Sequence, residues 1–281
     1  MGLRVLAPGK VVLVGEFAVL DGAPAVVAAV DRGVVCRVEH AGALAIETAE
    51  DDRFVRRALE AVRAPPARYV FADSNPVPGG GKLGLGGSAA ATVAAVVAGT
   101  GGRWAPADVQ RIAQEVHAEV QGSGSGVDVA ASVYGGVLRY EAGAVTRLEA
   151  VAPSVVFTGV SAETAPRIAR YLAWPDREAF VREMRAAVDA FPADPVRALR
   201  EAGTLLRSMA HEAGIPYWTP AIDTLVRLAE EHGGAAKPSG AGGGDVVVAL
   251  FPDADRSGAW ERAATSAGFL LIPVKITEGV S

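Results

Sequence analysis

The sequence has a single cysteine, Cys36, among 281 residues, and no CxxC pair or Cys/His cluster. An intrachain disulfide is therefore excluded. The first residues, MGLRVLAPGK, lack the continuous apolar stretch and small-residue cleavage site of a secretory signal. These absences predict a reducing, cytoplasmic location.

The chain also lacks a large excess of charge of either sign. It has 27 Lys and Arg against 32 Asp and Glu, a net charge of −5 that does not predict a nucleic-acid partner. With 50% hydrophobic and 21% charged residues, the composition is that of a globular protein with one large or two ordinary domains. Residues 83–102 are uncharged, but six of them are glycine, so we do not expect a membrane span.

Hydrophobic periodicity and turn residues predict a mixed α/β fold. Strands are expected at 3–6, 11–14 and 25–30, the first two separated by Pro8 and Gly9, then at a hairpin around Gly143 and at the segments DVVVALF and LLIPVKI. Helices are expected at 89–98, 106–121, 161–173, 176–190, 194–213, 217–232 and 255–267. The segment GSGSGVD is expected to be a loop, and a domain boundary is expected near residue 150.

The 33 glycines are clustered, and one cluster directly precedes a predicted helix. In PVPGGGKLGLGGSAAAT, residues 76–92, Gly84, Gly86 and Gly87 come just before that helix, with Lys82 close by. Such a loop lets backbone N–H groups converge on an anion, and the helix N-terminus adds partial positive charge. The segment therefore predicts a phosphate-binding loop, although glycine-rich turns before helices also occur without a ligand.

Two familiar phosphate-binding motifs fit this loop poorly. GLGGSA matches the G-x-G-x-x-A dinucleotide pattern, but Arg103 and Trp104 stand near the place where an acidic residue is expected. A Walker A loop is absent as well, because Gly9-Lys10 and Gly81-Lys82 both lack the earlier glycine. Phosphate binding is therefore expected to use another loop design.

Three segments together resemble the three signature motifs of the GHMP kinases, in order and at family-like spacing. They are PGKVVLVGEFAVLDGAPAVVAAVDRG at 8–33, KLGLGGSAAA at 82–91 and KPSGAGGGDVVVAL at 237–250. These are small-molecule kinases named for galactokinase, homoserine kinase, mevalonate kinase and phosphomevalonate kinase. The resemblance spans nearly the whole chain.

Within that family the residues are most similar to the phosphomevalonate kinase branch. Lys82 stands two residues before GLG, and His117 stands where mevalonate kinases typically carry a Glu. The segments GEFAVLDG, SGAGGGD and TGVSAET, the last at 158–164, point to the same branch.

The resemblance implies a role for each matching residue, with ATP and Mg²⁺ as cofactors. Lys10 and Asp128 would be the catalytic pair. The residues implied to bind ATP are Lys82, Gly84, Leu85, Gly86, Gly87, Ser88 and Ala89. Those implied to bind the acceptor are Lys10, Lys82, His117, Ser125, Ser239, Gly240, Ala241, Gly242 and Gly243. Ser88 would be the Mg²⁺ ligand, and the family's GLGSS is here GLGGS, with Gly87 at the first serine.

The resemblance also implies the fold and the reaction. Residues 1–150 would form a ribosomal protein S5 domain 2-like, ATP-binding domain, and residues 151–281 a ferredoxin-like domain. ATP and the acceptor, 5-phosphomevalonate, would meet in the cleft between them, with a trimmed substrate lid at about 42–75.

Some alternatives stay open from the sequence. Arg139 is a further, weaker candidate for an anion-binding cation, and Asp245 is expected to start a strand rather than contact ligand. His117 could equally be a buried, hydrogen-bonded histidine. Another acceptor, such as mevalonate, or a non-catalytic ligand sensor with the same fold remain the rival functions.

Overall fold

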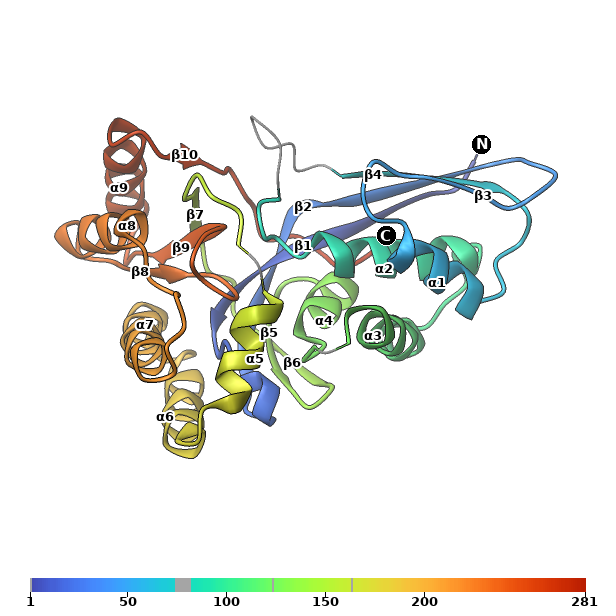
Figure 1. Cartoon of the computed structure of the whole chain (residues 1–281). Coiled ribbons are helices and arrows are strands. Elements are labelled where there is room, and N and C mark those ends of the chain that lie inside the picture. Colours follow the sequence, from blue (N-terminus) through green and yellow to red (C-terminus); the bar gives the residue numbers. More distant parts are fainter. Residues whose placement is uncertain (1, 74–81, 123, 163) are drawn as a thin grey trace.

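The computed structural model describes residues 2–73, 82–122, 124–162 and 164–281. Within them the chain forms two β-sheets covered by helices (Figure 1). Residues 76–81 of the glycine-rich segment, together with Ser123 and Glu163, lie outside the described residues. The mixture of helices and strands confirms the predicted α/β class.

The first sheet has the strand order β3-β4-β2-β5-β6, and β1 pairs with β2. Its strands are β1 (Arg4–Val14), β2 (Ala25–Glu39), β3 (Ala45–Glu47), β4 (Arg68–Asp73), β5 (Val137–Glu141) and β6 (Ala144–Leu148). The helical segments that accompany it are η1 (Ala18–Asp21), α1 (Arg53–Ala61), α2 (Gly87–Gly99), α3 (Pro106–Gln121) and α4 (Val127–Tyr134). Helix α2 packs on β1 and β2 and also against α1, α3 and α4. It is apolar on all sides because it is covered on all sides.

The second sheet is antiparallel and has the order β10-β7-β9-β8. Its strands are β7 (Ser154–Phe157), β8 (Ala235–Pro238), β9 (Val246–Leu250) and β10 (Leu270–Leu271). The helices of this half are α5 (Ala165–Ala173), α6 (Arg177–Ala190), α7 (Pro195–Glu212), α8 (Pro220–Glu231) and α9 (Ala254–Ser266). The succession β7, α8, β8, β9, α9, β10 is the βαββαβ arrangement of a ferredoxin-like domain, as predicted.

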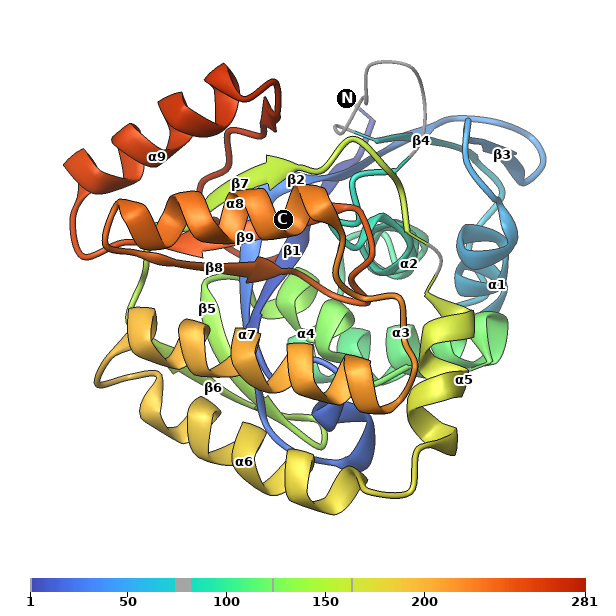
Figure 2. The same ribbon diagram turned by 60° about the vertical axis from the view of Figure 1, so that its left-hand side comes forward.

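Strands β7, β8 and β9 are buried on both faces, which explains why most of their residues are apolar. Alternate residues of a strand point to opposite faces. Val155 of β7 therefore packs with α6, α7 and the first sheet, whereas Val156 packs with α8 and α9. Figure 2 shows these two pairs of helices on opposite sides of the sheet. The apolar cluster that contains Val155 also contains residues of β1 and β2, so it joins the two sheets.

The prediction of two short strands around Pro8 and Gly9 was wrong. Arg4–Val14 is one strand, and its register against β2 shifts between Pro8 and Gly9. Proline and glycine are tolerated in a strand at such an irregularity. A Cβ on Gly33 of β2 would lie 2.1 Å from the carbonyl oxygen of Ala7, so β2 can pass β1 here only with glycine. This close approach lets β2 continue to Glu39, well beyond residue 30, where the strand was predicted to end.

Helix α4 was also missed, because the loop GSGSGVD was expected to include Val127 and Asp128. Both residues lie in the first turn of α4, which follows Gly126 in the left-handed conformation (φ 81°). The helix is eight residues long and mostly Ala, Val and Ser, so it lacks the polar face that marks a helix in the sequence. By contrast, helix 106–121 and the hairpin around Gly143 form as predicted.

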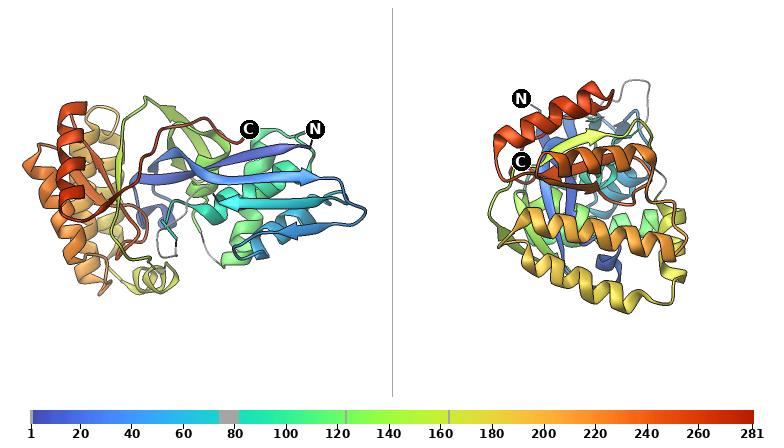
Figure 3. Two further views of the ribbon diagram at one scale, coloured as in Figure 1. Left: turned by 90° about the horizontal axis from the view of Figure 1, so that it is seen from above. Right: turned by 90° about the vertical axis from the view of Figure 1, so that its left-hand side faces the viewer.

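The predicted boundary at residue 150 falls between β6 and β7, and we keep 1–150 and 151–281 as proposed domains. The last residues return to the first sheet, where Leu6 and Ser281 exchange backbone hydrogen bonds of 2.8 and 3.0 Å. Figure 3 (left) shows both chain ends beside that sheet. Among the described residues, no helix has the length and apolarity needed to cross a bilayer.

A larger side chain in α2 tests whether this helix is tightly packed against the first sheet and the neighbouring helices. Ala95 is completely buried. We expect Ala95→Leu to lower the free energy of unfolding by roughly 1–3 kcal/mol, because the extra carbons displace packed neighbours. The same change at exposed Ala107 of α3 is the control, with an expected effect within about 0.5 kcal/mol. Urea unfolding measures the free energy of unfolding of both variants. Equal losses at the two positions would contradict the tight packing of α2.

Candidate active site

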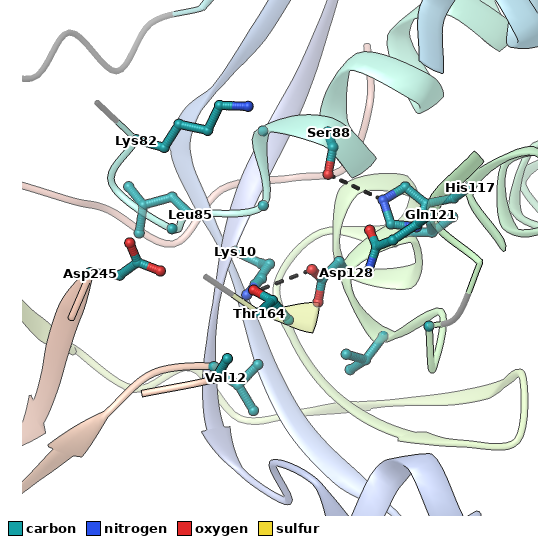
Figure 4. A pocket seen from close by; sticks show the side chains of 18 of the residues that line it. Lys10, Val12, Lys82, Leu85, Ser88, His117, Gln121, Asp128, Thr164 and Asp245 are labelled. Atoms are coloured by element: carbon teal, nitrogen blue, oxygen red, sulfur yellow. Dashed lines mark hydrogen bonds and ion pairs between the residues drawn. The ribbon is translucent and has the colours of Figure 1, made fainter. Parts of the chain in front are cut away.

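A cavity of ≈ 340 Å³ lies where β1, the loop before α2, the start of α4 and the loop after β8 come together. This volume is in the range of small-molecule sites. Figure 4 shows Lys10, Ser88, His117 and Asp128 around it. The residues predicted from the sequence that line the cavity are Lys10, Lys82, Gly84, Leu85, Gly86, Gly87, Ser88, His117, Ser125, Asp128, Ser239, Gly240 and Ala241.

The loop before α2 needs glycine at two positions. Gly84 and Gly86 both have positive φ, 75° and 77°. A Cβ on Gly84 would lie 2.5 Å from the carboxyl group of Asp245, and one on Gly86 would lie 3.0 Å from the Lys10 side chain. Gly86 is also the N-cap of α2, so the first N–H groups of the helix face the cavity edge. This geometry suits an anion such as a phosphate group.

Lys10 and Asp128 form an ion pair inside the cavity. The Lys10 ammonium is 3.6 Å from Asp128 Oδ2, and the two side chains are 7% and 34% exposed. Lys10 lies on β1, and its backbone N–H donates a hydrogen bond of 2.8 Å to Leu85 O. Asp128 is held in the first turn of α4. The arrangement places one fixed positive charge beside the glycine loop.

His117 is buried against Phe54 and hydrogen-bonded to Ser88. Its Nε2 is 3.2 Å from Ser88 Oγ, and its ring centroid is 5.1 Å from that of Phe54. Burial lowers the pKa of His117 below its ordinary value of 6.5, while the Asp128 carboxylate acts in the opposite direction. Burial therefore disfavours the charged imidazole, so this environment does not favour His117 as a cation for the acceptor.

The two other cationic candidates lie at or beyond the edge of the cavity. Lys82 is at the rim, with a side chain 69% exposed and its Nζ 3.2 Å from Glu50 Oε2. Arg139 does not line the cavity, because it binds Glu141 at 2.7 Å and Asp189 at 3.0 Å. The structure therefore brings Lys82 to the cavity, as the prediction required, and leaves Arg139 outside its lining.

Three predicted site residues do not line the cavity. Ala89 belongs to α2 and is completely buried in the core. Gly242 and Gly243 face away, because Cβ atoms on them would lie 2.1 Å from the Tyr217 ring and 2.2 Å from the Arg167 guanidinium. Glycine is therefore needed at these two positions for the packing of the loop after β8, and not for binding in the cavity.

Asp245 lines the cavity, although the sequence favoured a place at the start of a strand. It precedes β9 and has a φ of 54°, which is unusual for a residue other than glycine. Its Oδ1 accepts a 3.0 Å hydrogen bond from the Ala162 N–H. Burial raises the pKa of Asp245, opposed by this hydrogen bond and by the charge of Lys10.

Glu16 and Lys237 were also not identified from the sequence as residues of the site. They form a fully buried ion pair beside the cavity, with side chains 2% and 0% exposed. Both residues lie within the quoted motifs, Lys237 at the very start of KPSGAGGGD. A lysine before a proline resembles an ordinary surface residue in the sequence, so only the fold reveals that it is buried.

Comparison with known proteins assigns the chain to a family. Residues 53–136 match the GHMP kinases N terminal domain and residues 184–268 match the GHMP kinases C terminal domain. A phosphomevalonate kinase from Streptomyces sp. (strain CL190) is 31% identical, over 89% of this chain and 90% of the relative. The chain therefore belongs to the GHMP kinases, which are phosphotransferases, and it has their two-domain fold, as predicted.

Other relatives carry two different names. A mevalonate kinase from Thermococcus sibiricus is 28% identical, over 89% of this chain and 90% of the relative. The phosphomevalonate kinase of Streptococcus pneumoniae, solved in complex with phosphomevalonate and AMPPNP, superposes with a TM-score of 0.85 at 16% identity, covering 99% of this chain and 100% of that one. At 16% identity, the similarity to the Streptococcus pneumoniae structure shows a shared fold and no more.

The buried state of His117 predicts a specific pH dependence of stability. The unfolded chain takes up a proton at this histidine near pH 6.5, and the folded protein resists that proton because its pKa is lowered. Stability is therefore lost as pH falls below 6.5, with a slope of up to about 1.4 kcal/mol per pH unit from this group. We expect His117→Gln to reduce the loss between pH 7.5 and 5.5, measured by urea unfolding.

The control for this measurement is His40→Gln, at an exposed histidine. This variant should keep the slope of the unsubstituted protein. An unchanged slope in His117→Gln would contradict a lowered pKa of His117 in the folded protein.

Proposed function

We propose that this protein transfers the terminal phosphoryl group of ATP to the phosphate of 5-phosphomevalonate, giving ADP and 5-diphosphomevalonate. The observation that carries the proposal is the Lys10–Asp128 pair, fixed beside a glycine loop at the N-terminus of α2. Phosphoryl transfer depends mainly on positioning and on charge neutralisation, and this arrangement supplies both. Membership of the GHMP kinases supports the reaction class.

The nucleotide phosphates would lie along the loop from Gly84 to Ser88. Backbone N–H groups at the start of α2 would bind the phosphate oxygens, and the positive end of the helix would favour their charge. Lys82 stands at the rim of the cavity, where its long side chain would reach an exposed part of the same ligand. Ala89 would act through the packing of α2 rather than by contact.

The residues at this loop fit a divalent cation carried by the nucleotide. Ser88 Oγ is a hard oxygen donor at the helix N-terminus and lines the cavity. Mg²⁺ usually needs only one or two protein ligands when phosphates supply the rest. When bound, it would neutralise charge on the phosphate oxygens. The 3.2 Å hydrogen bond between Ser88 Oγ and His117 Nε2 would orient the serine hydroxyl.

Lys10 would neutralise charge where the acceptor meets the nucleotide. A new bond forms between an acceptor phosphate oxygen and the γ-phosphorus, and the bond from that phosphorus to the ADP oxygen breaks. The second pKa of a phosphate monoester is about 6, so the attacking oxygen is largely ionised at pH 7. Asp128 would therefore act mainly by holding the Lys10 ammonium in place rather than by removing a proton.

The acceptor would be bound by the loop after β8 together with the end of β1. Ser239, Gly240 and Ala241 line this part of the cavity, and Ser125 lines it near α4. Lys10 and Lys82 are the lysines that line the cavity among the described residues. The relatives named phosphomevalonate kinase and mevalonate kinase support an acceptor of the mevalonate pathway. A phosphorylated acceptor agrees with the two lysines and with the absence of a carboxylate at His117.

A panel of acceptors tests the proposed reaction. Purified protein with Mg-ATP would be offered phosphomevalonate, mevalonate, homoserine and galactose separately, and ADP release would be measured. We expect turnover of phosphomevalonate, and we expect Lys10→Met to lower kcat on the order of 10²–10³-fold, as for the loss of a transition-state charge partner. Exposed Lys275→Met is the matched control.

Turnover of mevalonate instead would overturn the acceptor but keep the reaction class. Absence of turnover with all four acceptors, combined with tight nucleotide binding, would favour the ligand-sensor alternative.

A serine variant tests the proposed metal contact. We expect Ser88→Ala to raise the Mg²⁺ concentration needed for half-maximal activity about tenfold or more, because a direct ligand is lost. The matched control is Ser266→Ala, at the exposed end of α9. Titration of activity with Mg²⁺ at saturating ATP measures the effect, and identical curves for both variants would exclude Ser88 as a ligand.

A further inference from the structure

Lys237 of β8 makes contacts that none of the proposed catalytic steps uses. Its side chain is completely buried, and its ammonium donates to three acceptors. These are Glu16 Oε1, Val12 O at 3.3 Å and Pro238 O at 3.0 Å. An ammonium has three N–H groups, so its hydrogen-bonding capacity is filled.

The peptide groups at Val12 are held from the second sheet on both sides. Lys237 binds the Val12 carbonyl, and the Ser239 hydroxyl accepts a 2.8 Å hydrogen bond from the Val12 N–H. The register of β1 against β2 shifts between Val12 and Val14, which accompanies this departure from regular pairing. The last part of β1 is therefore clamped to the end of β8.

This clamp is two residues from Lys10. Residues i and i+2 of a strand point to the same face, and Lys10 and Val12 both line the cavity. At the other side, the Lys10 N–H is bonded to Leu85 O of the glycine loop at 2.8 Å. A Cβ on Gly240 would lie 3.8 Å from the Lys10 ammonium, so the loop that follows Lys237 runs beside this charge.

Stability alone does not account for the buried pair. Apolar residues of similar volume commonly replace a buried ion pair without loss of stability, because they avoid the cost of desolvating two charges. Moreover, Glu16 Oε2 is buried and has no hydrogen-bond partner within the described part of the chain. The free-energy cost of burying these two charges is better explained by their hold on the backbone of β1 at Val12.

We propose that Lys237 is a positioning residue for phosphoryl transfer. Paired with Glu16, it fixes β1 at Val12 and thereby sets the place of the Lys10 ammonium relative to the glycine loop and to the loop Ser239–Asp245. The effect on rate rests on the proposed function, whereas the clamp itself is a property of the fold. A displacement of about 1 Å in a reacting group is enough to lower a rate on the order of 10²-fold.

The test uses Lys237→Met, the double variant Glu16→Gln/Lys237→Met, and Lys275→Met as the matched control. Lys237→Met leaves the Glu16 carboxylate buried without its partner, so its melting temperature should fall. The double variant removes both charges and should recover most of the lost melting temperature. In both variants kcat should fall on the order of 10²-fold, with KM for ATP changed less than about threefold, because the glycine loop is intact.

A second readout does not depend on activity. Hydrogen exchange of the backbone amides of residues 10–14 should be faster in both Lys237 variants than in the control. Recovery of kcat together with the melting temperature in the double variant would overturn the proposal, because the pair would then be only structural. Unchanged exchange at residues 10–14 would overturn it as well. If the unsubstituted protein turns over no acceptor, the proposed function fails, and the exchange measurement alone decides the clamp.

Discussion

The position of one buried ammonium group constrains much of this structure. Lys10 has a side chain that is 7% exposed, and a charge so far from water is stable only with anionic or polar partners close by. Asp128 provides a carboxylate 3.6 Å away, from the first turn of α4. The glycine loop approaches from another side, where Gly86 leaves room for the lysine side chain. The charge is thereby fixed where we propose that the phosphoryl group is transferred.

The site also depends on loops whose conformations require glycine. Gly84 leaves space for the Asp245 carboxyl group, and through it the loop before α2 contacts the loop after β8. Asp245 in turn binds the Ala162 N–H, so three segments distant in sequence meet at one carboxylate. Beneath them, Ser239 and Lys237 hold the backbone of Val12. The two sheets are therefore joined directly behind the cavity.

Local sequence signals predict the long helices, such as Pro106–Gln121, and most of the site residues predicted from the motifs line the cavity. The failures have physical causes. Helix α4 has no polar face, and β1 continues through Pro8 and Gly9 because a register shift accommodates them. The charge of His117 and the burial of Lys237 depend on neighbours far away in sequence, which no local pattern records. The same holds for Gly242 and Gly243, whose direction is set by Tyr217 and Arg167.

The most direct test of the central claim is the bond that the protein makes. Phosphorus-31 NMR of the protein incubated with Mg-ATP and phosphomevalonate follows every phosphate group in one sample. We predict that the phosphomonoester resonance of phosphomevalonate is replaced by the coupled pair of resonances of a diphosphate monoester, in step with the formation of ADP. An unchanged phosphomonoester resonance, with ADP formed only together with inorganic phosphate, would contradict transfer to this acceptor.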